Sequence, residues 1–162
     1  MTLNTHLRHI ASIGLLFAFL VGSGGAWAVD GPQASCYYST QEAVDAFPSG
    51  CDSVLGSLEV KYSTDITTIN ALANLTSVGG YLNISYTSLT NIDGLVNLTS
   101  VGGNLNLGGN NALTSLDGLA NLTSVWGYLD ISDNASLTNL DGLANLTSVE
   151  GRLAISSNPS LT

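Results

Sequence analysis

Acidic residues recur at one position of this sequence and could bind a cation. Asp-Gly pairs begin at Asp93, Asp117 and Asp141, and a stack of carboxylates can bind an oxygen-seeking ion such as Ca²⁺. Asp-Gly is also ordinary turn chemistry, in which the carboxylates lie in solvent. The dense Gly-Gly-x-Gly-x-Asp spacing of calcium-binding β-rolls is absent, so we expect solvated turns and no metal site.

Asparagine recurs as the first residue of an Asn-Leu-Thr-Ser-Val motif. Asn-Leu-Thr is an acceptor sequence for N-glycosylation, and Asn83-Ile-Ser and Asn134-Ala-Ser are two more. The alternative is an asparagine ladder, in which stacked side-chain amides bond to neighbouring backbone at a bend. We favour the ladder because one residue type holds the same position in every repeat. The column consists of Asn74, Asn97, Asn121 and Asn145.

The N-terminus is typical of a secretory signal peptide that covers residues 1–28. It carries Arg8, then an apolar run over residues 10–21, then small residues at Ala26 and Ala28. The apolar run is shorter than the ~20 residues that a membrane-spanning helix needs. We therefore expect cleavage rather than a retained anchor, and a mature chain that is secreted, at the cell surface or in the periplasm.

Charge and residue types exclude several classes of function. Cleavage leaves two bases, Lys61 and Arg152, against 12 acids, which gives a formal charge of −10. An acidic surface argues against nucleic acid and anionic membranes as partners. Cleavage also removes both histidines, and the two bases lie about four repeats apart, roughly 19 Å at strand spacing. We expect neither an enzyme nor a cofactor.

The two cysteines, Cys36 and Cys51, predict a disulfide, because an exported chain with an even cysteine count is usually bridged. The bridge would close a loop of about 15 residues and stabilise by about 3 kcal/mol in the chain-entropy model. The residues between the cysteines predict a short helix with Ser39 or Thr40 as its N-cap. We expect residues 29–53 to form a disulfide-bonded helical cap. A metal or redox role for two cysteines is the less favoured alternative.

These residues are positioned by a repeat of 23–24 residues. The four Asn-Leu-Thr-Ser-Val motifs begin 23, 24 and 24 residues apart, and a degenerate repeat precedes Asn74. A period of this length predicts a solenoid, in which neighbouring turns bury each other's apolar side. Residues 54–162 would form about four and a half turns, without a C-terminal cap after Thr162.

Each repeat contains one strand. Paired apolar residues alternate with polar ones, which predicts a strand with one buried face. A glycine two residues before each pair predicts a tight bend into the strand. The strands of successive turns would stack as a parallel sheet with about 4.8 Å between them. The pairs are Leu82/Ile84, Leu105/Leu107, Leu129/Ile131 and Leu153/Ile155.

The alternate positions of these strands face outward and differ between repeats. Exposed tyrosine and tryptophan, flanked by asparagine, aspartate and arginine, can stack on a sugar or anchor a protein partner. The alternative is that aromatic residues are simply favoured on strand surfaces. The candidate ligand-binding residues are Tyr81, Asn83, Asn104, Asn106, Trp126, Tyr128, Asp130 and Arg152.

The repeats resemble those of receptor L domains, the modules of insulin- and epidermal-growth-factor-receptor ectodomains. The stretch Cys51-Asp-Ser-Val-Leu-Gly-Ser-Leu-Glu-Val60 is similar to the family's cysteine followed by a Gly-x-Leu-x-Ile entry into the first strand. Later repeats match as Asn-Leu-Thr-Ser-Val-x-Gly-x-Leu-x-Ile. The resemblance covers residues 36–162. It implies a right-handed parallel β-helix of leucine-rich-like repeats, and a ligand-binding or adhesion module rather than an enzyme.

We therefore expect a non-enzymatic recognition or adhesion module that binds an extracellular glycan or protein through the outward sheet face. One alternative is a structural envelope or matrix protein that self-associates through its open C-terminal turn. A fragment of a longer surface protein is another. Ice or crystal binding through threonine columns is a third, which we disfavour because each threonine is flanked by a core leucine.

Overall fold

The structure is a computed structural model that describes residues 35–162, so the expected signal peptide lies outside it. No helix in the described residues is long and apolar enough to cross a membrane. The elements, in chain order, are β1 (Cys36–Tyr38), α1 (Gln41–Asp45), β2 (Ser53–Val54), β3 (Leu58–Ser63), the 3-10 turn η1 (Asn70–Leu72), β4 (Ser77–Val78), β5 (Leu82–Thr87), η2 (Asp93–Leu95), β6 (Ser100–Val101), β7 (Leu105–Asn106), η3 (Asp117–Leu119), β8 (Ser124–Val125), β9 (Leu129–Asp130), η4 (Asp141–Leu143), β10 (Ser148–Val149) and β11 (Leu153–Ala154).

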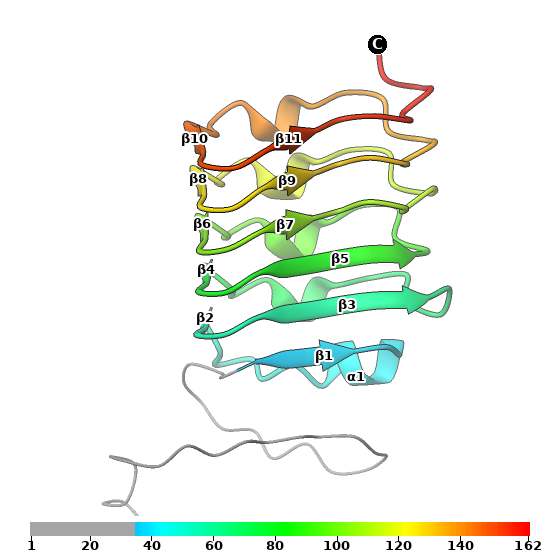
Figure 1. Ribbon diagram of the computed structural model, residues 1–162. Coiled ribbons are helices and arrows are strands. Elements are labelled where there is room, and N and C mark those ends of the chain that lie inside the picture. The colour runs from blue at the N-terminus through cyan, green and yellow to red at the C-terminus, as the bar shows by residue number, and fades with distance from the viewer. Residues whose placement is uncertain (1–34) are drawn as a thin grey trace, which may run out of the picture.

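Two parallel sheets run along the length of the molecule (Figure 1). The long sheet has the order β1-β3-β5-β7-β9-β11, and the short sheet has the order β2-β4-β6-β8-β10. Strands pair at equivalent repeat positions, as with Leu58, Leu82 and Leu105 in the long sheet. The predicted stack of parallel strands is therefore confirmed. The short sheet, built from the Ser-Val dipeptides, and the sixth strand β1 were not predicted.

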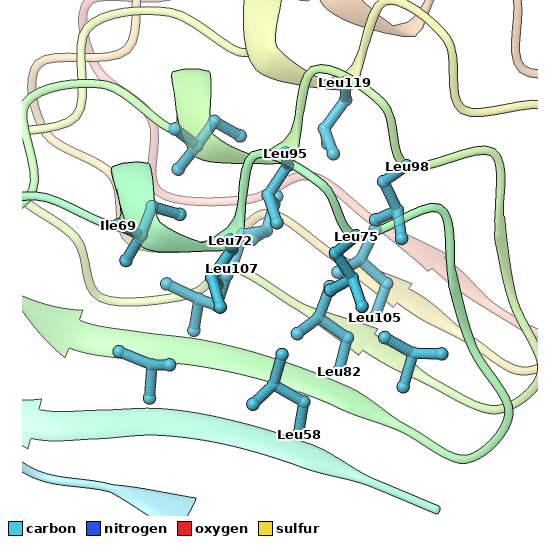
Figure 2. Packing of buried hydrophobic residues seen from close by; sticks show 14 of the residues in the cluster. Leu58, Ile69, Leu72, Leu75, Leu82, Leu95, Leu98, Leu105, Leu107 and Leu119 are labelled. Carbon is cyan, nitrogen blue, oxygen red and sulfur yellow. The ribbon is translucent and has the colours of Figure 1, made fainter. Parts of the chain in front are cut away.

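The interior is filled by columns of leucine, isoleucine and valine. Figure 2 shows leucines of the long sheet, such as Leu58 and Leu82, facing Leu72 and Leu95 of the 3-10 turns. These four side chains are fully buried. Each buried aliphatic side chain contributes roughly 1.5–3 kcal/mol, so the repeated columns stabilise the fold turn by turn.

The Asp-Gly pairs begin 3-10 turns rather than simple bends. In η2, the amide of Leu95 donates to the carbonyl of Ile92 at 2.9 Å. Glycine is required here by close contact between turns, because a Cβ on Gly118 would lie 2.0 Å from the carbonyl oxygen of Ile92. In the first turn Ala71 holds this position. Glycine is therefore needed at this position wherever the backbone of a preceding turn packs against it.

The N-terminal cap contains the predicted helix. The side chain of Thr40 accepts a hydrogen bond from the Ala43 amide at 3.2 Å, which identifies Thr40 as the N-cap of α1. The Gln41 carboxamide oxygen then accepts from the amides of Thr67 and Thr68 at 2.9 and 3.1 Å. α1 is thus tied to the loop that leads into η1.

The predicted disulfide between Cys36 and Cys51 is not supported, because the described residues contain no disulfide. Cys51 is fully buried, and its Sγ donates to the Ser53 carbonyl at 3.2 Å. Burial raises the pKa of the Cys36 thiol, against a hydrogen bond with Tyr38 that lowers it. A raised thiol pKa slows disulfide formation, because the thiolate is the attacking species. The cap is held instead by strand pairing of β1 and by packing.

Candidate functional site

The outward face of the long sheet carries two rows of polar and aromatic side chains. The first row is in register across neighbouring strands and consists of Glu59, Asn83, Asn106 and Asp130. The second row precedes the first core leucine of each strand and consists of Tyr81, Asn104, Tyr128 and Arg152. All candidate ligand-binding residues except Trp126 lie in these two rows.

Two shallow hollows lie along the rows. The first has a volume of about 260 Å³ and the second about 210 Å³, and Tyr128 lines both. The predicted residues are thus brought together in one continuous strip, which we call the sheet-face strip. The first hollow is lined by Glu59, Lys61, Tyr81, Leu82, Asn83, Asn104, Asn106 and Tyr128, and the second by Tyr128, Asp130, Arg152 and Ala154.

The first hollow has an ion pair at one end. Lys61 Nζ contacts a carboxylate oxygen of Glu59, and the Tyr81 hydroxyl donates to the other oxygen. Burial raises the pKa of Glu59, but hydrogen bonds from Lys61 and Tyr81 outweigh it and bring the pKa below its usual value. The hydrogen bond to Glu59 raises the pKa of Lys61. Both groups are charged at neutral pH, and their charges cancel.

Asparagine amides form the centre of the first hollow. The side-chain oxygen of Asn104 accepts from the Tyr128 amide at 3.0 Å, and that of Asn106 accepts from the Gly108 amide at 2.8 Å. Asn83 differs, because its side-chain oxygen is buried and accepts no hydrogen bond from any described residue. A buried unpaired acceptor costs about 1–3 kcal/mol. A ligand that reorients this amide toward the hollow and donates a hydroxyl to its oxygen would remove that cost.

Two predicted residues lie less centrally. The side-chain oxygen of Asp130 accepts from the Ser132 amide at 2.9 Å, and Asp130 lines the second hollow with Arg152. Trp126 follows β8 at the bend between the sheets, where it is 69% exposed and lines neither hollow. The alternation that predicts strand faces does not extend around this bend.

The exposed asparagine column bonds to the backbone of the preceding turn, as the ladder interpretation requires. The four side-chain amides donate at 2.6–2.7 Å to carbonyl oxygens: Asn74 to Ser49, Asn97 to Ala73, Asn121 to Val96 and Asn145 to Ala120. Threonine hydroxyls two residues later do the same, for example Thr99 to the Thr76 carbonyl at 3.0 Å. These hydroxyl donors are engaged inside the molecule.

Sequence reasoning missed a second asparagine ladder, which is buried. The backbone amide of Thr87 donates to the side-chain oxygen of Asn110 at 3.0 Å. In the same way, the backbone amide of Asn110 donates to the side-chain oxygen of Asn134 at 2.9 Å, and the backbone amide of Asn134 donates to the side-chain oxygen of Asn158 at 2.9 Å. Asn134 has no exposed surface, so its glycosylation sequence is inaccessible in the folded chain. The signal was an asparagine five residues after the first core leucine in three successive turns.

Sequence reasoning also missed a stacked tyrosine pair beside the strip. The rings of Tyr62 and Tyr86 have centroids 5.4 Å apart and an interplanar angle of 15°. Both residues have positive φ angles, 56° and 54°, a conformation that bulky residues rarely adopt. Lys61 Nζ lies 5.4 Å from the Tyr62 ring centroid, and a Cβ on Gly109 would come 2.6 Å from the Tyr86 ring. The stack is therefore closed at both ends.

The aspartate column does not converge on a cation. Asp93, Asp117 and Asp141 are exposed, and each begins a 3-10 turn. Within residues 35–162 no group of three or more histidine, cysteine, aspartate or glutamate side chains could hold a metal ion.

Comparison with known proteins identifies the family. A family model described as "Receptor L domain" matches the chain twice, over residues 50–114 and 99–162. A comparison with curated proteins gave no match. The two matches together cover β2 to β11 and begin about two turns apart, as expected for a solenoid whose repeats fit the same pattern in more than one register. The chain belongs to the receptor L domain family, whose members are non-enzymatic ligand-binding modules.

Proposed function

We propose that this protein is a secreted or cell-surface recognition module that binds an extracellular glycan or protein through the sheet-face strip. The observation that carries the proposal is the pair of adjoining hollows, which share Tyr128, together with the unpaired buried oxygen of Asn83, a residue that lines the first hollow. A fold maintained by its core alone gains nothing from burying an unpaired acceptor.

Two further features support recognition. Tyr81 and Tyr128 are 40% and 42% exposed at the edges of the first hollow, and tyrosine offers a rigid apolar ring with a polar end. The second feature is the expected signal peptide, which supports export.

We take the solenoid to be a right-handed β-helix, because crossovers between parallel strands of one sheet are right-handed in nearly all proteins.

Binding of the full-length chain to a mixed array of glycans and extracellular proteins tests the proposal. We expect Tyr128→Ala to weaken binding of a positive ligand by about tenfold or more, because Tyr128 lines both hollows. Asn111→Ala, a substitution at an exposed asparagine outside both hollows, is the control. Trp126→Ala shows whether the site extends around the bend. Far-UV circular dichroism checks the fold, and equal binding by wild type and Tyr128→Ala contradicts the proposal.

A second candidate function is self-association. In the last turn Leu153 and Ile155 are 50% and 38% exposed, whereas the equivalent Leu129 and Ile131 are fully buried. β11 pairs with β9 on one edge only, and an open strand edge beside exposed apolar side chains is a template for another strand. Sedimentation over a range of concentrations tests this: oligomers that dissociate in a Leu153→Lys variant support it, and a monomer at every concentration contradicts it.

A further inference from the structure

We propose that the ligand of the sheet-face strip is an uncharged linear oligosaccharide that lies across the strands, with one sugar residue on each turn of the solenoid. The inference rests on the proposed function and narrows its ligand to one chemical class. It follows from three properties of the strip: its charge balance, its mixture of amides and tyrosines, and its repeat distance.

The strip is locally neutral although the protein is acidic. The first hollow contains one acid and one base, Glu59 and Lys61, which form an ion pair. The second hollow also contains one acid and one base, Asp130 and Arg152. Neither hollow has an excess charge to pair with a charged ligand, and the acidic protein as a whole repels anions. An uncharged ligand loses no solvation of its own charge on binding here.

The lining suits hydroxyl groups. The side-chain amides of Asn83, Asn104 and Asn106 carry N–H donors. The oxygens of Asn104 and Asn106 already accept one backbone hydrogen bond each and have a second lone pair for a sugar hydroxyl. Tyr81 and Tyr128 add rings that can pack against the apolar face of a sugar. A protein ligand would need a dry apolar pocket for its anchor residue. The only aliphatic residues that line the hollows are Leu82, which is buried in the core, and Ala154.

The spacing suits a chain of sugars. Asn83, Asn106 and Asp130 lie in register on β5, β7 and β9, so equivalent polar groups recur about every 4.8 Å. A pyranose residue lengthens an extended glycan by a comparable distance, and each sugar can therefore meet an equivalent side chain. Each hollow is smaller than the ~300–1,000 Å³ of a drug-sized ligand pocket, which fits single units of a longer chain.

The test is a chain-length series measured by isothermal titration calorimetry with the full-length protein. The probes are cello-, malto-, xylo- and N-acetylchito-oligosaccharides from the monosaccharide to the hexasaccharide, with oligogalacturonates as the charged counterparts. We expect the affinity for one neutral series to rise with each residue and to level off near four residues, since β3 to β11 span about four strand spacings. The matching oligogalacturonates should bind at least about tenfold more weakly.

The diagnostic variant is Asn83→Leu, because the side-chain oxygen of Asn83 accepts no hydrogen bond from a described residue and the substitution keeps the backbone pairing of β5. We expect about five- to tenfold weaker binding of the tetrasaccharide, as for one lost hydrogen bond to a ligand. Asn111→Ala, an exposed asparagine outside both hollows, should bind as wild type does.

The outcomes separate this inference from the proposed function. Length-independent binding, equal binding of oligogalacturonates, or no binding of any neutral series overturns the inference. If a protein ligand instead binds and is lost in Tyr128→Ala, the inference fails while the proposed function stands. If no glycan or protein binds the strip, both fail.

Discussion

Strands β3 and β5 of the long sheet end in a different way from the later strands β7, β9 and β11. β3 and β5 are six residues long, and their pairing continues to Ser63 and Thr87. β7, β9 and β11 are two residues long. Fully buried core columns lie beneath β3, β5, β7 and β9 alike, so the hydrophobic pattern does not determine strand length.

Side-chain hydrogen bonds account for the difference. In β7 and β9 the side chains of Asn106 and Asp130 accept from backbone amides two residues later, a local turn that competes with strand pairing. The buried ladder that begins at Asn110 then holds the backbone. In β5 the equivalent Asn83 makes no such turn, and its oxygen remains unpaired. Backbone bonds between turns continue beyond β7, from Leu107 to Asp130 and from Gly109 to Ser132. The turns therefore differ in the local side-chain bond, which Asn106 makes and Asn83, in the candidate site, does not.

The largest effect is expected when the buried ladder is broken. Asn134→Ala removes the acceptor of the Asn110 amide and the donor to the Ile131 carbonyl, and both groups remain buried. We expect the free energy of unfolding to fall by about 2–4 kcal/mol, measured in urea. The matched change in the exposed column, Asn145→Ala, should cost about 1 kcal/mol. Equal costs would contradict the distinction between the two ladders.

An intermediate effect is expected in the tyrosine stack. Tyr86→Ala loses the stacking and keeps the left-handed backbone, whereas Tyr86→Gly loses the stacking and relieves that strain. We expect the glycine variant to be the more stable by about 1 kcal/mol, the reverse of the usual order of alanine and glycine. The measurement is thermal unfolding of both variants. A more stable alanine variant would show that the tyrosine backbone is not strained.

The smallest effect is expected in the ion pair of the first hollow. Because the pKa of Glu59 is lowered in the folded protein, its contribution is present above the unfolded value of about 4.3 and is lost as the pH falls through the folded value. Wild type should exceed Glu59→Gln in stability by no more than about 1 kcal/mol at pH 7. Urea unfolding from pH 7 to pH 3 should show this gap closing on the acidic side, and a constant gap would contradict the assignment.

The features that could be predicted from the sequence are those that depend on a single physical cause, such as burial of the core or strand alternation. A core position such as Leu105 excludes water in every turn, so its column repeats and its register can be counted. The strip was predicted for the same reason, since strand alternation determines which side chains face outward. Trp126 was placed on the strip by counting through a bend, where the alternation no longer holds.

The remaining features depend on neighbours that are distant in sequence. Asn134 was interpreted locally, as the start of a glycosylation sequence, although its partners Asn110 and Asn158 lie one turn away on either side. The expected disulfide rested on the redox state of a compartment, which the packing of Cys36 and Cys51 does not encode. The left-handed tyrosines could not be predicted, because residue type argues against that conformation.

The side-chain hydrogen bonds between turns also imply an order of assembly. Asn97 donates to the carbonyl of Ala73, Thr99 to that of Thr76, and Asn110 to that of Ile84, so each new turn bonds to the turn before it. A turn can make these bonds only on a neighbour that is already folded. Growth of the solenoid then resembles elongation of a filament, in which each turn adds to a folded neighbour. During synthesis, which proceeds from the N-terminus, each emerging repeat meets a finished template, and partly made chains are shorter versions of the same structure.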